Sequence, residues 1–246
     1  MTRPPLAAAP TGEVEVPEAV RALAAGATVT PVWRNRLGGL TFHVGDHYVK
    51  WAPAGVSGLD LRAEAERLSW ASRWVSVPRV VGQGADAQGS WLVTEALPGL
   101  SPVDPRRPVP PEVAAAAVGQ GLRTLHDTLP VAECPFDWGV STRLARVTEE
   151  NRSLPSSPPE IDRLVVCHGD PCVPNTLIGA DGSFTGHVDL GSLGVADRWA
   201  DLAVAAWSMD WNFGPGHDGL VYEAYGVIPD PERVAYYRLL WDLPTL

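Results

Sequence analysis

The chain has 246 residues and a mass of 26.3 kDa, which is enough for one large domain or two modest lobes. Its formal net charge of -10 argues against nucleic-acid and membrane partners, because both are polyanions. The charge favours a cationic small-molecule partner, although a solvated acidic surface is the simpler explanation, and we find no apolar run long enough to cross a bilayer.

The first part of the chain is predicted to form a small β-rich lobe. Residues 1–19 lack a sustained apolar core, so we expect a loosely ordered lead-in and not a signal peptide. Alternating and β-branched segments flank residues 37–39 and a Gly45-Asp46 turn. Residues 59–74 have helical spacing, and residues 77–97 indicate two strands around a Gly-rich turn.

A proline-rich stretch at residues 98–111 marks a change, and the chain beyond it is predicted to be mainly helical. Two short apolar segments, residues 163–170 and 184–191, each contain acidic residues at their carboxyl ends. The predicted helices are 110–129, 198–213 and 230–243. We therefore expect an α+β protein of two lobes, residues 1–96 with an antiparallel sheet and one helix, and residues 97–246 with mostly helices.

The stretch VVCHGDPCVPNTLI, residues 165–178, carries the clearest chemical signal. His168, Asp170 and Asn175 stand as H-x-D-x-x-x-x-N, and Asp189 opens a D-x-G further on. Phosphoryl transfer needs a carboxylate that orients the attacking hydroxyl and oxygen ligands that hold magnesium. The alternative interpretation is that Asp170 and Asn175 only form turns.

Two residues of the first lobe fit the same chemistry. Lys50 ends an expected third strand, where a kinase places the lysine that binds the α- and β-phosphates, and Glu64 lies on the following helix, where its partner belongs. Each residue alone is typical of a surface charge. Together and in this order they support a phosphoryl-transfer site.

With these motifs the chain resembles the aminoglycoside 3'-phosphotransferases, antibiotic kinases with a bilobal protein-kinase-like fold. The resemblance runs from about residue 32 to 243 and is strongest over 165–202, through VVCHGDPCVPNTLI and GHVDLGSLGVADRWADLA. It implies that 1–96 is the nucleotide-binding lobe and that 97–246 is the catalytic and substrate-binding lobe. ATP or GTP and Mg²⁺ are the implied cofactors.

The resemblance also implies roles for individual residues. Asp170 becomes the general base, and Asn175 and Asp189 become the magnesium ligands. Asp201 becomes the buried carboxylate that braces the catalytic loop, with His168 in a similar structural role. On the nucleotide side, Lys50 pairs with Glu64, and Glu95 and Ala96 would meet the adenine edge mostly through backbone groups.

The chain departs from the family pattern around the substrates. Leu37-Gly38 stands where relatives have a Ser or Thr, so phosphate contacts there would rely on backbone N–H groups. Residues 151–162 replace a longer helical insert that supplies acidic groups, and the tail from Trp241 onward differs from the family's acidic pair and terminal aromatic. Ser192 and two tryptophans stand where relatives have charged groups.

Several residues are candidates for the acceptor pocket. Carboxylates would bind ammonium groups and tryptophans would stack on sugar rings, although core packing is the alternative role for each tryptophan. The candidates are Asp210, Asp242, Glu160, Asp162, Trp207, Trp211 and Trp241.

The sequence thus predicts a kinase that transfers the γ-phosphoryl of ATP or GTP to a hydroxyl of an aminoglycoside and confers resistance. The alternatives are a kinase of another aminocyclitol, sugar or natural product, and a nucleotide-binding pseudokinase. Three cysteines without metal-ligand spacing favour reduced thiols in the cytoplasm. We expect a monomer or a weak dimer.

Overall fold

The computed structural model describes residues 7–8, 10, 12–147 and 157–243. The chain divides into two compact units, the first made of Met1–Trp70 and Pro78–Ala96 and the second of Ala71–Val77 and Leu97–Leu246. No helix among the described residues is long and apolar enough to span a membrane.

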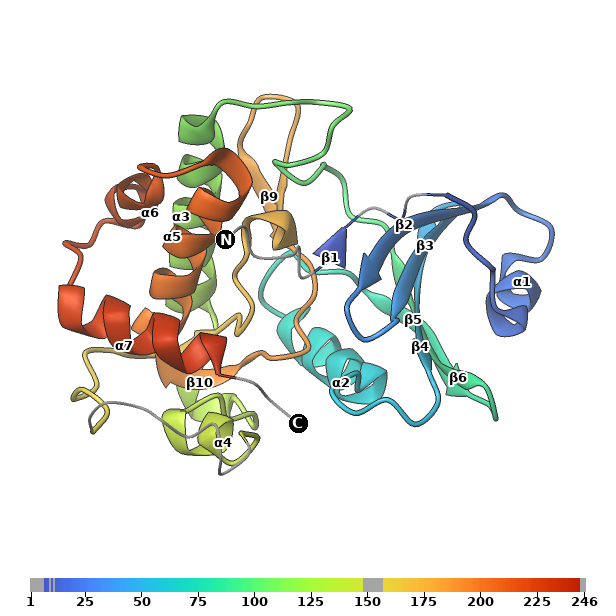
Figure 1. Cartoon of the computed structure of the whole chain (residues 1–246), viewed down its shortest axis with the longest axis horizontal. Coiled ribbons are helices and arrows are strands. Elements are labelled where there is room, and N and C mark those ends of the chain that lie inside the picture. The colour runs from blue at the N-terminus through green and yellow to red at the C-terminus, as the bar shows by residue number, and fades with distance from the viewer. Residues whose placement is uncertain (1–6, 9, 11, 148–156, 244–246) are drawn as a thin grey trace. The chain divides into compact units, whose positions relative to one another are not determined.

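The first unit is built on a six-stranded antiparallel sheet in the order β1-β2-β3-β4-β6-β5 (Figure 1). The β3–β4 register pairs Val44 with His47, so the chain reverses at the expected Gly45-Asp46 turn. The strands are β1 (Ala7–Ala8), β2 (Val29–Asn35), β3 (Leu40–Val44), β4 (His47–Pro53), β5 (Val80–Ala85) and β6 (Gly89–Glu95). Helix α2 (Leu61–Ala71) lies within the predicted helix at 59–74.

The N-terminal segment differs from the predicted lead-in. Ala7 and Ala8 pair with the end of β2, and helix α1 (Glu18–Ala24) follows Pro17. Val14 and Val16 pack against a core cluster that includes Val20, Phe42 and Val49. The prediction of a loosely ordered segment was therefore wrong for this part of the chain, because the apolar side chains of Val14 and Val16 pack against the core of the unit.

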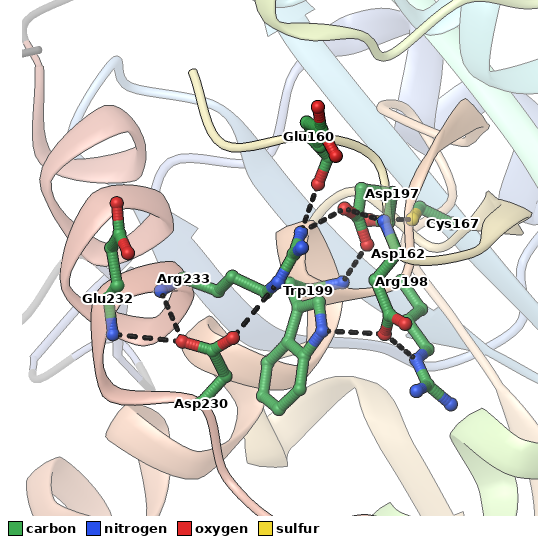
Figure 2. Close-up of polar contacts among 9 residues, drawn as sticks. All are labelled: Glu160, Asp162, Cys167, Asp197, Arg198, Trp199, Asp230, Glu232 and Arg233. Carbon is green, nitrogen blue, oxygen red and sulfur yellow. Dashed lines mark hydrogen bonds and ion pairs between the residues drawn. The ribbon is translucent and has the colours of Figure 1, made fainter. Parts of the chain in front are cut away.

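The second unit is mainly helical, as predicted. Helix α3 (Pro111–Thr128) begins at a proline, and α5 (Trp199–Phe213) is buried along most of its length. Helix α7 (Pro231–Asp242) is capped by Asp230, whose side chain accepts hydrogen bonds from Glu232 N and Arg233 N at 3.0 and 3.2 Å. Figure 2 shows this cap. The shorter helices are η1 (Val131–Glu133), α4 (Val140–Leu144), η3 (Val173–Asn175) and α6 (Asp218–Tyr225).

Two small antiparallel sheets hold the polar loops of this unit. Strand β7 (Leu164–Cys167) pairs with β10 (Gly194–Asp197), and β8 (Thr176–Ile178) pairs with β9 (Phe184–His187). The two predicted apolar segments are β7 and β9, whereas β8 and β10 were not predicted. The α+β class is confirmed, and the sheets place the loop after β7 beside the loop after β9.

Candidate active site

In the first unit, Lys50 on β4 forms an ion pair with Glu64 on α2, with 2.6 Å between Lys50 Nζ and Glu64 Oε1. Glu64 is 5% exposed, so its carboxylate is largely removed from water. A buried carboxylate needs a cationic partner, and loss of either side chain would leave an uncompensated charge. The predicted pair is therefore formed, and it fixes the Lys50 ammonium group on the strand.

At the end of β6, the backbone N–H groups of Glu95 and Ala96 form hydrogen bonds within the first unit, which the sequence did not indicate. Glu95 N donates to Arg79 O at 2.9 Å, and Ala96 N donates to Asp46 O at 2.9 Å. The Glu95 side chain forms an ion pair with Arg79, and this hydrogen bond lowers the pKa of Glu95. Both N–H groups already donate within the unit. The carbonyl oxygens of Glu95 and Ala96 are the backbone atoms that could accept a hydrogen bond from an adenine amino group.

The turn between β2 and β3, residues 36–39, is closed by Asn35. The Asn35 Oδ1 atom accepts hydrogen bonds from Leu37 N at 3.0 Å and from Gly39 N at 2.9 Å. Gly38 N donates to Asn35 O at 3.2 Å, and Gly38 adopts a φ of 84°. The backbone N–H groups expected to contact phosphate are therefore bound within the turn itself.

In the second unit, the predicted catalytic loop follows β7 and is anchored by Asp201 on α5. Asp201 Oδ2 accepts from His168 N at 2.6 Å, and Asp201 Oδ1 accepts from Gly169 N at 3.0 Å. Gly169 has a φ of 84°, and a Cβ there would lie 2.1 Å from Ser192 O. A glycine is required at this position because both the backbone angle and the close approach exclude a side chain.

A buried network extends this anchor away from the loop. His126 on α3 bridges Asp201 Oδ2 and the Tyr225 hydroxyl, at 3.0 Å each. Burial alone would raise the pKa of Asp201, but the hydrogen bond with His126, the nearby His168 ring and the Gly169 N–H hold this pKa below its usual value. We did not predict His126 from the sequence, although it lies four residues after Leu122 on a buried helix face, where a polar side chain needs a partner.

The His168 side chain is buried and contacts two parts of the backbone. Its ring is buried, its Nδ1 atom accepts from Asp170 N at 3.3 Å, and its Nε2 atom lies 3.1 Å from Val188 O. These contacts join the loop after β7 to the loop after β9. They suit the bracing role that the sequence suggested.

The Asp170 side chain is held in an environment that suits a proton acceptor. Its Oδ1 atom is buried and has no hydrogen-bond partner among the described residues. Burial, followed by the nearby negative charge of Asp189, raises the pKa of Asp170. An unpartnered carboxylate oxygen next to a second carboxylate is costly unless a ligand supplies a proton or a cation.

A backbone hydrogen bond joins the segments that carry Asn175 and Asp189. Asn175 Nδ2 donates to Asp170 O at 2.9 Å, and Asn175 O accepts from Val188 N at 3.0 Å. Because the amide nitrogen is used, the Asn175 side-chain oxygen is the atom left to bind a cation. Asp189 has a φ of 65°, which is unusual for a residue other than glycine. The orphaned Asp170 oxygen and this all-oxygen donor set fit a hard cation such as Mg²⁺.

A second group of possible ligand atoms, on His126, Cys167 and Asp201, lies within 4.8 Å. Both Asp201 oxygens already accept backbone hydrogen bonds from the catalytic loop, and Cys167 Sγ donates to Asp197 O at 3.4 Å. Hydrogen bonding accounts for this cluster without a metal.

The candidate acceptor residues lie in two groups, one near the beginning of α7 and one near its end. Trp207 on α5 lies near Trp241 on α7, with 6.5 Å between the two ring centres. Asp210 also lies on α5. Glu160 lies near the beginning of α7, where its carbonyl oxygen accepts a hydrogen bond from Arg233 Nη1 (Figure 2). Arg233 and Asp242 are nine residues apart on this helix, or about 14 Å along its axis. The structure therefore does not bring Glu160 together with Asp242.

The Asp162 side chain forms hydrogen bonds with other residues of the second unit. Its Oδ2 atom accepts from Arg198 Nε at 2.6 Å and from Trp199 Nε1 at 2.8 Å, as Figure 2 shows. Half of the segment at 151–162, namely residues 151–156, and the C-terminal carboxylate of Leu246 lie outside the described residues.

Comparison with known proteins identifies the family. The model of the "Phosphotransferase enzyme family" matches residues 19–146 and 136–237. An aminoglycoside 3'-phosphotransferase from Streptomyces fradiae is 37% identical over 227 residues, covering 78% of this chain and 84% of the relative.

Two solved structures share the fold. The crystal structure of an aminoglycoside-3'-phosphotransferase of type VIII has a TM-score of 0.71 and 31% identity, covering 91% of this chain and 97% of the other. The structure of APH(3'')-Id from Streptomyces rimosus in complex with ADP and streptomycin has a TM-score of 0.68 and 26% identity, covering 91% and 94%. The predicted kinase-like fold is confirmed, and the chain belongs to the phosphotransferase enzyme family.

Proposed function

We propose that this protein transfers the γ-phosphoryl group of ATP to a hydroxyl of an aminoglycoside and thereby confers resistance to it. The observation that carries this proposal is Asp170, whose buried, unpartnered Oδ1 atom lies in a loop fixed by Asp201. The family membership and the ADP- and streptomycin-bound relative support the same substrates. The predictions of GTP as an alternative donor and of a cytoplasmic monomer or weak dimer also stand as proposals.

In this mechanism Asp170 orients the acceptor hydroxyl and accepts its proton as the oxygen attacks the γ-phosphorus. Burial and the charge of Asp189 raise the pKa of Asp170, and a raised pKa makes the carboxylate a better proton acceptor. The bond between the γ-phosphorus and the β,γ-bridging oxygen breaks as the new phosphorus–oxygen bond forms, and ADP leaves.

Each unit contains residues that could bind the nucleotide or its magnesium. Lys50, kept in place by Glu64, would bind the α- and β-phosphates, and the Glu95 and Ala96 carbonyl groups would receive the adenine amino group. Asn175 and Asp189 would hold magnesium, which when bound neutralises charge on the phosphate oxygens. We also assign Asp210, Asp242, Trp207 and Trp211 to acceptor binding.

The main alternative is the same chemistry on another aminocyclitol, sugar or natural product, because Trp207, Trp211 and Trp241 give the acceptor face an aromatic character. A pseudokinase is a weaker alternative, since the Lys50, Asp170, Asn175 and Asp189 set is intact.

The first experiment measures nucleotide turnover with Mg²⁺ and a panel of acceptors. The panel contains 4,5- and 4,6-disubstituted aminoglycosides, streptomycin, hygromycin-type aminocyclitols and simple sugars. Acceptor-dependent ADP release, together with one added phosphate in the mass of an aminoglycoside, is the expected result, and NMR of the product distinguishes the 3' from the 3'' position. Nucleotide binding without turnover of any aminoglycoside would contradict the proposal.

A further inference from the structure

The second half of the predicted catalytic loop forms the short helix η3. A 3₁₀ turn bonds each N–H to the carbonyl three residues before it, so the first N–H groups need partners from elsewhere. Asn175 N donates to Cys172 O at 2.9 Å, and Pro174 has no N–H. Val173 N is therefore the donor at the start of η3 that needs an acceptor from outside the turn, and Val173 is fully buried.

Ser208 on α5 supplies this acceptor. Its Oγ atom accepts from Val173 N at 3.0 Å, and the serine is fully buried. Asn212, one turn further along α5, donates through Nδ2 to Ser208 O at 2.7 Å and to Ser208 Oγ at 3.2 Å. Because the bond to Val173 is buried, loss of the serine oxygen would leave the Val173 N–H without a partner.

Ser208 and Asp201 hold the loop from one face of α5. They are seven residues apart, which is about two helical turns or about 10.5 Å along the axis, so their side chains leave the helix on the same side. Asp201 accepts from two N–H groups at the start of the loop, and Ser208 accepts from Val173 N near its end. One helix thus anchors the loop on both sides of Asp170.

The second half of the loop also carries Asn175. Thr176 N donates to Val173 O at the end of η3, and Asn175 Nδ2 donates to Asp170 O at 2.9 Å. These bonds tie the orientation of the Asn175 amide to the backbone that begins at Val173. A displaced η3 would move the Asn175 side-chain oxygen, the atom left to bind a cation, while the anchor at Asp201 stayed in place.

We propose that Ser208 is a positioning residue for phosphoryl transfer, and that its hydroxyl oxygen fixes η3 so that the Asn175 side-chain oxygen is placed for Mg²⁺. This inference rests on the proposed function and adds to it a residue that acts through the loop backbone. The two anchors then have different tasks. Asp201 holds the part of the loop that leads to Asp170, and Ser208 holds the part that carries the metal ligand.

The first test measures metal affinity without turnover. Mn²⁺ takes the same oxygen ligands as Mg²⁺ and gives an EPR signal, so it is titrated into the whole protein saturated with a non-hydrolysable ATP analogue. Ser208→Ala removes the acceptor oxygen and should raise the dissociation constant for Mn²⁺ about tenfold, because a buried N–H loses its partner. Ser208→Thr keeps the oxygen and should stay within about twofold of the wild-type protein.

Steady-state kinetics should show the same selectivity. Ser208→Ala should need about tenfold more Mg²⁺ for half-maximal turnover, with an unchanged KM for the aminoglycoside. Ser101→Ala is the matched control, because Ser101 Oγ also accepts from a valine N–H, that of Val103 at 3.4 Å, in a turn of the same unit. The control should alter neither Mn²⁺ binding nor the Mg²⁺ requirement.

The wild-type protein provides a test that needs no variant. If the bond between Val173 N and Ser208 Oγ favours metal binding, metal binding must favour that bond by the same factor. With the nucleotide analogue bound, added Mg²⁺ should slow hydrogen exchange of the Val173 amide about tenfold and leave the Val103 amide unchanged. An unchanged Val173 amide would overturn the proposal, even if Ser208→Ala failed to fold.

These measurements separate the inference from the proposed function. Weaker Mn²⁺ binding in Ser208→Ala, in a protein that phosphorylates no aminoglycoside, would support the role of Ser208 at the metal site and contradict the proposed function. Phosphorylation with the same Mg²⁺ requirement in Ser208→Ala and the wild-type protein would support the proposed function and overturn the role of Ser208. An equal loss of Mn²⁺ affinity in Ser101→Ala would also overturn that role.

Discussion

The predicted catalytic loop at 168–175 and the turn at 36–39 are organised in the same way, and they differ in how firmly they are held. In each, one side chain accepts two backbone N–H groups: Asp201 those of His168 and Gly169, and Asn35 those of Leu37 and Gly39. Asp201 is fully buried and reaches the loop from 32 and 33 positions away in the sequence. Asn35 is neutral and local, and it caps a turn open to water.

The difference in burial and charge has an energetic consequence. Hydrogen bonds to a charged acceptor contribute about 1.5–3 kcal/mol, whereas neutral ones contribute about 0.5–1.5 kcal/mol, and water competes for exposed groups. The loop that positions Asp170 is therefore fixed before any ligand binds. The turn at 36–39 can exchange Asn35 for another acceptor at small cost, which suits a segment expected to meet phosphate.

The largest expected effect comes from the residue that the fixed loop positions. Asp170→Asn keeps the shape of the side chain but removes its ability to accept a proton. We expect kcat to fall by about 10²–10⁴-fold, the usual contribution of a positioned base, with a nearly unchanged Kd for ATP. Stopped-flow or steady-state assays of ADP release, combined with nucleotide titration, measure the two quantities.

Asp181→Asn is a matched control for this change, because Asp181 lies on an exposed turn where its side chain accepts hydrogen bonds from Ser183 N and Ser183 Oγ. Its kcat should equal that of the wild-type protein. Turnover within threefold of wild type in Asp170→Asn would remove Asp170 from the mechanism.

The next prediction concerns the anchor of the loop. Asp201→Asn replaces one oxygen acceptor by an amide donor, so His168 N or Gly169 N loses its buried partner. We expect the free energy of unfolding to fall by about 3 kcal/mol, because a buried N–H is left unsatisfied and the pairing with His126 is weakened. Urea denaturation followed by circular dichroism measures this change.

The same control, Asp181→Asn, should alter the free energy of unfolding by less than about 0.5 kcal/mol. An equally small change in Asp201→Asn would mean that the loop is held by other contacts, and the contrast between the two loops would disappear.

From the sequence, spacing predicts Asp170, Asn175 and Asp189 as catalytic and metal-binding residues, and chain order adds Lys50 and Glu64. The structure shows the Lys50–Glu64 ion pair, and the catalytic roles stay predictions. It also predicted the main strands and helices, where periodicity is strong. His126 and the Asn35 cap were missed, because each depends on a three-dimensional partner or on turn geometry that short-range pattern does not specify. Helix α1 was missed because seven residues flanked by Pro17 give little periodicity, and tertiary packing against the sheet stabilises them.

A smaller effect is predicted for the electrostatics within the fixed loop. Burial and the charge of Asp189 both raise the pKa of Asp170. The ionised form is therefore disfavoured in the folded protein, and stability decreases as the pH rises from the ordinary pKa of Asp through the raised one. Asp189→Asn should lower the pKa of Asp170 without returning it to the ordinary value, since burial is the larger cause and remains.

Carboxyl ¹³C NMR of the metal- and nucleotide-free protein follows this titration directly. The Asp170 resonance should shift at lower pH in Asp189→Asn than in the wild-type protein and should be unaffected in Asp181→Asn. An unchanged midpoint would show that the two carboxylates do not interact.

The smallest effect is expected at the turn of the first unit, where Asn35→Ala removes the shared acceptor of Leu37 N and Gly39 N. Hydrogen exchange of these two amides should become about fivefold to tenfold faster, because each loses one neutral hydrogen bond of about 1 kcal/mol. Asn35→Asp keeps an oxygen acceptor and should preserve the protection. The amides of Gln88 and Gly89, which Asp86 Oδ1 caps at 2.8 and 3.0 Å, serve as an internal reference and should not change.

The wild-type protein allows the two loops to be compared directly. His168 N and Gly169 N should exchange far more slowly than Leu37 N and Gly39 N, because their acceptor is charged and buried. Equal exchange rates for the two pairs of amides would contradict the assignment of one loop as fixed and the other as adaptable.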